Sequence, residues 1–242
     1  MFQLEEFLLE LYLLKVFVNK FNQVMRQCMN AIRNIKQTLK PYYHMLLRMI
    51  KWQRRIGLHC KDFSVISNNC TGGYVYQYYG ISYKTPTEGV YFTTDDYLKL
   101  IANPRYYFTH KVTLIPSKES TLYSKEKPFT FPVGKIDDIE IYFMHYPNPE
   151  EALSKWYRRS KRLNYSKIFC LLTENEFFKD EHILEFDSIM KNQNCKGVCL
   201  TFNMYKHGGR HVSNVPTNGG NAAWRPDIIV RCIDWKKIIN NL

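Results

Sequence analysis

Apolar residues follow two different periods along this chain, and the period changes near residue 60. Between residues 4 and 39 they recur at alternating steps of three and four, which is the spacing of one face of an α-helix. From residue 63 onward, short apolar runs alternate with segments of helical length. The pattern therefore predicts a helical arm over residues 1–58 and a folded domain over residues 59–242.

The apolar positions of the arm form one continuous seam: Leu4, Phe7, Leu11, Leu14, Val18, Phe21, Met25, Cys28, Ile32, Ile35 and Leu39. We expect Pro41 to end or kink this helix, and residues 42–55 to form a second, basic amphipathic helix. Three partners fit the arm. They are a second copy of the chain joined as a coiled coil through residues 4–39, an anionic membrane surface, and the chain's own domain. The pattern alone does not separate them.

Positive charge is concentrated in the arm. Residues 1–55 carry ten Lys or Arg and three acids, and no acid occurs between Glu10 and Asp62. The whole chain has a net charge of +12. A single-sign run of this length indicates an anionic surface as partner, although a solvated helix face would look the same. Nucleic acid is not expected, because no known nucleic-acid-binding module is present.

The domain alternates apolar strands with helices, which is typical of an α/β fold with a mostly parallel sheet and covering helices. Strands are predicted at 63–67, 89–92, 139–144, 167–172, 197–202 and 227–232, and helices after Gly72, over 95–102 capped by Thr94, from an Asn148 N-cap onward and over 181–190. We expect 106–115 to be extended and 116–132 to be a loop or short hairpin. The glycine-rich residues 207–226 are predicted to be a loop, interpreted as a lid.

The first candidate site follows the strand at 63–67. Asn68, Asn69 and Cys70 interrupt the apolar run, and Gly72 and Gly73 open the next helix. A strand, a tight turn and a helix N-terminus present backbone N–H groups and a thiol of lowered pKa to a ligand. Under the alternative interpretation, the two asparagines are turn formers and the cysteine is a small buried residue.

The second candidate site follows the strand at 139–144. His145 ends this strand, and the next helix carries Lys155, Arg158, Arg159 and Arg162 on one stripe. Such a stripe could bind phosphates or carboxylates, or could be a solvated face. Because strand ends of a parallel sheet share one edge, we expect Cys70 and His145 to meet, with the arginines less well placed.

Several common sites are excluded or disfavoured. The chain has no GxGxxG, GxxxxGK[ST] or GxSxG motif. Cys195, Cys199, His207 and His211 resemble a zinc site only superficially, since Cys199 lies in an apolar strand, so no metal is expected. Seven cysteines without a disulfide framework, and no signal-like or membrane-spanning run, favour a cytoplasmic protein, with a peripheral position on the inner face of the membrane as an alternative.

Two long segments resemble the bacterial family called domain of unknown function 1919, whose members are often labelled exopolysaccharide or capsule biosynthesis proteins. The segments are FSVISNNCTGGYVYQYYGISYKTPTEGVYF and IEIYFMHYPNPEEALSKWYRRSKRLN. The resemblance covers about residues 60–235. Its matching positions are Asn68, Asn69, Cys70, Gly72, Gly73, His145, Tyr146, Glu151, Ala152, Trp156, Arg158, Arg159 and Arg162. Thr71 stands where the family has an aromatic residue, usually Trp.

The resemblance implies a role in surface-polysaccharide assembly rather than a defined reaction. We expect a transferase that moves an acyl group, with acyl-coenzyme A as one candidate donor, onto a sugar or nucleotide sugar. Cys70 would be the nucleophile and His145 the base, the N–H groups near Gly72 and Gly73 an oxyanion cradle, and the arginines a phosphate grip. Asn68, Asn69, Tyr146 and Trp156 would contact substrate. The alternatives are a glycosyl- or sugar-phosphate transferase that binds a nucleotide diphosphate, and a non-catalytic membrane-associated assembly factor.

Overall fold

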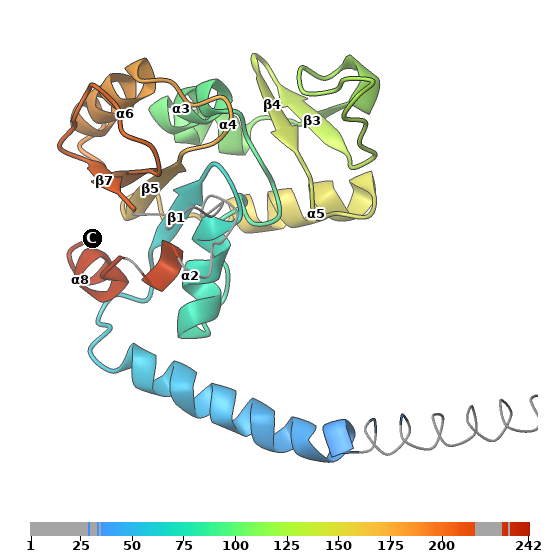
Figure 1. Ribbon diagram of the computed structural model, residues 1–242, viewed down its shortest axis with the longest axis vertical. Helices are drawn as coiled ribbons and strands as arrows, with labels where there is room; N and C mark the ends of the chain where they lie inside the picture. Colours follow the sequence, from blue (N-terminus) through green and yellow to red (C-terminus); the bar gives the residue numbers. More distant parts are fainter. Residues whose placement is uncertain (1–28, 30–32, 34, 216–228, 232) are drawn as a thin grey trace, which may run out of the picture. The chain divides into compact units, whose positions relative to one another are not determined.

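The computed structural model describes residues 29, 33, 35–215, 229–231 and 233–242 (Figure 1). They form two compact units, residues 1–53 and 54–242, which we describe separately. The elements of the second unit are β1 (Ser64–Ser67), α2 (Thr71–Tyr79), α3 (Thr94–Ala102), α4 (Pro104–Thr109), β2 (Thr113–Ile115), a 3-10 turn η1 (Ser117–Glu119), β3 (Val133–Ile136), β4 (Ile139–Tyr142), α5 (Pro149–Ser160), β5 (Ile168–Thr173), α6 (Glu181–Asn192), β6 (Lys196–Thr201), β7 (Val212–Asn214) and α8 (Trp235–Asn240).

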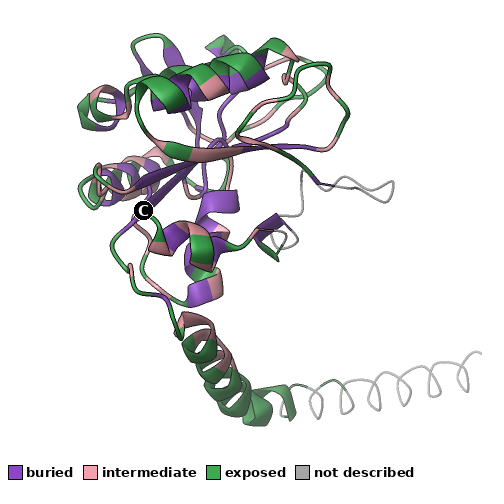
Figure 2. Cartoon of the chain, turned by 90° about the vertical axis from the view of Figure 1, so that its left-hand side faces the viewer, coloured by how far each residue is buried: buried purple, intermediate pink, exposed green. Residues whose placement is uncertain are grey.

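The main sheet has four parallel strands in the order β1-β5-β6-β7. Successive residues of a strand point to opposite faces, so Val65 and Ile66 of β1 enter two different apolar clusters. One cluster lies under α3, α5 and α6, and the other lies under α2 and α8. Figure 2 shows that the strands between these layers are buried. The predicted α/β fold with a mostly parallel sheet is confirmed.

A second sheet joins β2, β3 and β4 in antiparallel order, beside the main sheet in Figure 1. Strand β4 is the apolar run predicted at 139–144, but it pairs with β3 and not with β1 or β5. Its register with β3 is set by the turn at Asp137, which adopts φ 52°. The expectation that Cys70 and His145 follow strands of one parallel sheet is therefore wrong.

Local capping explains where the helices begin. The Asn148 side chain accepts a hydrogen bond of 2.8 Å from the backbone of Glu151, with Pro149 in the first turn, as predicted for α5. Helix α3 is capped by the side chain of Thr93 and not by Thr94. Helix α2 ends at Gly80, whose φ of 63° is left-handed and suits a residue without a Cβ.

Four other predicted elements differ in the structure. Residues 89–92 form only a single bridge, between Tyr91 and Tyr142. The start of 106–115 is helical, because the Asn103 side chain and Pro104 open helix α4 there. Of the strand predicted at 227–232, the described residues 229–231 are helical. The lid predicted at 207–226 contains strand β7, and its residues 216–226 lie outside the described part.

In the N-terminal part, residues 35–55 are described as one helix that continues through Pro41. Pro41 therefore does not end it. Most of the long helix predicted for residues 4–39 lies outside the described residues, and the arm boundary at residue 58 stays a prediction. Within the part of the chain that the structure describes, no helix combines the length and the apolar character needed to cross a bilayer.

Candidate functional site

Asn68 fixes the end of β1 to the end of β5. Its side-chain Nδ2 donates to the carbonyl of Thr173 at 2.8 Å, and its Oδ1 accepts the Thr173 backbone N–H at 2.9 Å. The residue is fully buried. Both halves of the amide are thus used inside the protein, so Asn68 positions the site and is not exposed to a substrate.

The first turn of α2 has no free donor for a ligand. The backbone N–H of Thr71 donates to Asn69 Oδ1, that of Gly72 donates to Ser67 Oγ, and that of Gly73 donates to the carbonyl of Cys70, each at 3.0 Å. The predicted oxyanion cradle at Gly72 and Gly73 is therefore wrong, because local side chains and the turn already satisfy these groups.

The loop after α2 returns to this turn and places Glu88 on it. Ser67 at the end of β1 donates its N–H to Thr87 Oγ1 at 3.2 Å, which anchors the loop. The carboxyl group of Glu88 then lies against Gly73, where a Cβ atom would fall 1.2 Å from Glu88 Oε2. The absence of a side chain at Gly73 is what makes room for the carboxyl group.

Glu88 is a half-buried acid without a hydrogen-bond partner for its carboxyl oxygens among the described residues, and its Oε2 is fully buried. Burial raises the pKa of this carboxyl group to about 7, against the opposing attraction of Arg159. A carboxyl group that titrates near neutral pH can both take and return a proton, which is the property of a general acid/base.

Cys70 lies next to Glu88. Burial, followed by the charge of Glu88, raises the pKa of its thiol to about 11, while a backbone hydrogen bond from Gly89 opposes the rise. The lowered thiol pKa predicted from the helix N-terminus is therefore wrong, because burial and a neighbouring carboxylate outweigh the helix end. Cys70 carries its proton at neutral pH.

Tyr146 and Arg159 hold the Glu88 loop from the other side. The Tyr146 hydroxyl donates to the carbonyl of Glu88 at 2.6 Å, and Arg159 Nη1 donates to the same carbonyl at 2.8 Å and to the Tyr146 hydroxyl at 2.6 Å. The Tyr146 ring also packs over Gly89, whose φ is +82°, and leaves no space for a Cβ there. Arg159 is 8% exposed, so its charge acts inside the protein.

The second sequence motif thus reaches the Glu88 loop through Tyr146 and Arg159, and not through the side chain of the predicted base. The backbone N–H of His145 donates to the carbonyl of Gly89 at 3.2 Å, but its side chain is exposed, and no hydrogen bond or ion pair to its imidazole is found in the described part of the chain. The pairing of the His145 imidazole with Cys70 therefore stays a prediction.

The remaining predicted residues do not join one binding surface. Arg158 and Arg162 are exposed while Arg159 points inward, so the expected cationic stripe is divided. Trp156 is 1% exposed and packs among Phe92, Phe108 and Phe143, which makes it a core residue and not a contact for substrate.

Sequence reasoning missed Glu88, although a signal was present. Glu88 is the one acid between Asp62 and Asp95, and it stands directly before Gly89 and a buried apolar run. A single acid inside such a segment is a candidate for a buried functional carboxyl group. Its pKa could not be inferred, because that depends on the contact with α2.

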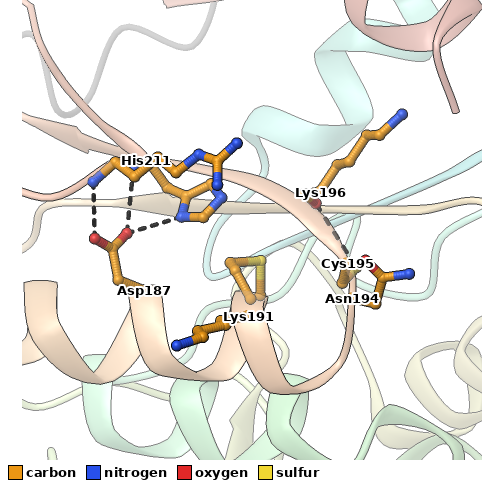
Figure 3. A pocket seen from close by; sticks show the side chains of 8 residues that line it. Asp187, Lys191, Asn194, Cys195, Lys196 and His211 are labelled. Atoms are coloured by element: carbon orange, nitrogen blue, oxygen red, sulfur yellow. Dashed lines mark hydrogen bonds and ion pairs between the residues drawn. The ribbon is translucent and has the colours of Figure 1, made fainter.

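A separate cavity of about 420 Å³ lies at the amino end of β6, lined by α6 and the segment before β7 (Figure 3). Asp187 there accepts hydrogen bonds from the backbone of Arg210 at 2.8 Å and from His211 Nδ1 at 2.9 Å. Figure 3 shows Cys195 and Lys196 at the opposite end from His211. Because the Asp187 carboxylate is already satisfied, we consider the Glu88 site the better candidate for chemistry.

No zinc-like cluster is formed by the residues considered from the sequence. His207 pairs with Asp180 at 2.6 Å, His211 pairs with Asp187, and Cys199 is fully buried in β6. Over the described ranges, no three His, Cys, Asp or Glu side chains are placed to share a metal ion.

Comparison with known proteins agrees with the resemblance seen in the two sequence motifs. A protein of Haemophilus influenzae (strain ATCC 51907 / DSM 11121 / KW20 / Rd), described as an uncharacterized protein, is 27% identical over 161 residues, which is 66% of this chain and 72% of that protein. The family described as Domain of unknown function (DUF1919) matches residues 42–213, which include β1, the Glu88 loop and α5. Since this match spans well over half of the sequence, the chain belongs to that family.

Proposed function

We propose that this chain is an acyltransferase in which Glu88 is the general base. The observation that carries the proposal is the carboxyl group of Glu88, which is half-buried, lacks a hydrogen-bond partner in the described structure and has a pKa of about 7. Such a group can accept the proton of an attacking hydroxyl at neutral pH. It lies beyond the carboxyl end of β1, which is where parallel α/β sheets bind ligands.

The proposed step is direct transfer from a thioester to a hydroxyl. The hydroxyl oxygen forms a bond to the acyl carbon while its proton passes to the Glu88 carboxylate. The carbon–sulfur bond of the donor then breaks, and Glu88 returns the proton to the departing thiolate. Atoms and charge balance without an oxidant or a metal.

A covalent route through Cys70 is less well supported, because a thiol with a pKa of about 11 is protonated at neutral pH. In the direct route Cys70 lines the site, and its replacement by serine leaves the general base in place. The choice of a sugar as acceptor and a coenzyme A thioester as donor is based on the resemblance to surface-polysaccharide proteins. The proposed acid/base chemistry is based on Glu88.

The test measures release of free coenzyme A from a panel of acyl-coenzyme A donors, with sugars and nucleotide sugars as acceptors. We expect acceptor-dependent release by the full chain, and a loss of about 100- to 10,000-fold in Glu88→Gln. Cys70→Ser should retain most activity. Glu185→Gln, which removes an exposed acid on α6, is the matched control and should behave as wild type.

Two results would contradict the proposal. One is full activity in Glu88→Gln, which would remove the assigned base. The other is a panel in which no donor releases coenzyme A and none raises the melting temperature, since a ligand that binds the folded state must stabilise it.

A further inference from the structure

The helix described over residues 35–55 has two chemically distinct halves. At about 100° per residue, one half of its circumference contains no charged residue at all. The apolar residues on this half are Ile35, Leu39, Tyr42, Tyr43, Met45, Leu46, Met49, Ile50 and Trp52. Trp52 and Tyr43 fall at its two borders. We call this half the apolar face.

The opposite half is basic. Its cations are Lys36, Lys40, Arg48 and Lys51, with His44 among them. Arg54 and Arg55, at the end of the helix, donate instead to the carbonyls of Tyr78 and Gly80. Leu47 is the one large apolar side chain on this half, and it is half-buried. No acid occurs on either half, because none lies between Glu10 and Asp62 in the sequence. The helix therefore separates apolar and cationic residues without internal neutralisation.

The apolar face is solvent-exposed. Leu39 is 57% exposed, Leu46 is 54% exposed and Trp52 is 61% exposed. Figure 2 shows the described turns of this helix as mostly exposed. An apolar surface of this length, open to water, marks an interaction site.

We propose that this helix lies on a lipid bilayer rich in anionic headgroups. The apolar face is about half of the circumference wide, as in helices that lie in the interface plane, whereas a coiled coil buries a narrower seam. Aromatic residues at the borders of the face suit the level of the headgroups. The cations beside them face anionic phosphates.

A second copy of the chain fits this surface less well. Pairing two such helices through their apolar faces would leave both basic halves without a counter-charge, because this helix offers no carboxylates to neutralise its lysines and arginines. The absence of acids favours a partner that supplies the negative charge itself. A bilayer with acidic lipids does so over the whole length of the helix.

The test is co-sedimentation of the full chain with vesicles of phosphatidylcholine alone and with about 30 mol % phosphatidylglycerol, the anionic lipid that supplies the surface charge. We expect binding to the anionic vesicles only, weakening as salt rises from about 0.05 to 0.5 M. Equal binding to both vesicle types, or no binding to either, would overturn the proposal.

Two variants with the same change of charge separate the apolar face from the basic half. Leu46→Glu places an acid at the centre of the apolar face, and Gln37→Glu places one on the basic half. We expect Leu46→Glu to lose at least about 20-fold in binding, and Gln37→Glu to lose about five-fold, the effect of one charge near the membrane surface.

Equal losses in the two variants would show that the apolar face does not insert, and would refute the orientation. Light scattering on the chain without vesicles measures its oligomeric state and tests self-association. A stable dimer that dissociates in Leu46→Glu, combined with absent vesicle binding, would assign the face to self-association instead.

Discussion

The carboxyl group of Glu88 occupies the space that a side chain at residue 73 would fill, so that a Cβ added to Gly73 would lie 1.2 Å from Glu88 Oε2 and 2.2 Å from its Cδ. The two residues are 15 positions apart, and the contact joins the first turn of α2 to the loop that follows it. It buries an acid beside Cys70 and gives the site a group that titrates near neutral pH.

Substitutions at the two adjacent glycines should have different effects. In Gly73→Ala the new methyl group meets the end of a flexible side chain, so Glu88 moves away and its pKa falls toward 4.5. The free energy of unfolding should change by less than about 1 kcal/mol, because alanine favours the helix. Activity should fall, and its dependence on pH should shift to lower pH.

Gly72→Ala is the matched comparison. Its methyl group would meet Ser67 Oγ at 2.7 Å and the Val65 carbonyl oxygen at 3.3 Å, both in β1, which cannot easily move. We expect a loss of stability of about 1–3 kcal/mol in chemical denaturation. Equal destabilisation by the two alanines would show that Glu88 is not free to leave Gly73.

Replacing the buried acid should stabilise the protein at high pH. Because the pKa of Glu88 is raised from 4.5 to about 7 on folding, the folded chain keeps a proton that the unfolded chain releases between these values. Its contribution to the free energy of unfolding therefore falls as pH rises through this range. The free energy of unfolding of Glu88→Gln, measured relative to wild type, should therefore increase between pH 5 and pH 8, by about 3 kcal/mol at most.

The measurement is thermal or urea unfolding at several pH values, with Glu185→Gln as the control. A constant difference between Glu88→Gln and wild type across this range would contradict the raised pKa.

The thiol of Cys70 should react slowly with iodoacetamide at neutral pH. Burial, then the charge of Glu88, raises its pKa, whereas a hydrogen bond from Cys170 lowers the pKa of the half-buried Cys195. Mass spectrometry of peptides should show Cys195 modified before Cys70 near pH 7.5.

At pH 8–9, where Glu88 is ionised, Glu88→Gln should speed the modification of Cys70 several-fold and leave the rate of modification of Cys60 unchanged. Unaltered Cys70 reactivity would show that Glu88 does not act on it.

Neighbouring arginines of α5 should differ in their effect on stability. Arg159 is buried and bonds the Glu88 carbonyl and the Tyr146 hydroxyl, so Arg159→Met should cost about 2–4 kcal/mol. Arg158 is exposed, and Arg158→Met should change the free energy of unfolding by no more than about 0.5 kcal/mol.

A second readout separates packing from electrostatics at Arg159. Because Arg159 lowers the pKa of Glu88, its removal should move the Glu88 titration to higher pH, as followed by NMR of the side-chain carboxyl group. A titration that stays in place would show that Arg159 acts only through packing.

The elements that depend on neighbouring residues were determined by the sequence itself. The side chain of Asn148 with Pro149 is sufficient to start α5, and the alternation of short apolar runs with segments of helical length is sufficient to predict β1, β5, α6 and β6. Helix α4 was not predicted, since its run of aromatic residues after Pro104 equally suits an extended segment.

Only the tertiary structure decided which strands pair and which side chains meet. The apolar run of β4 suits either sheet, and its place beside β3 results from the turn at Asp137 and from packing. The candidate site depends on the contact of Glu88 with Gly73. The pKa values of Glu88 and Cys70 follow from burial in that contact, because the cost of ionisation is set by the surroundings of a group and not by its neighbours in the sequence.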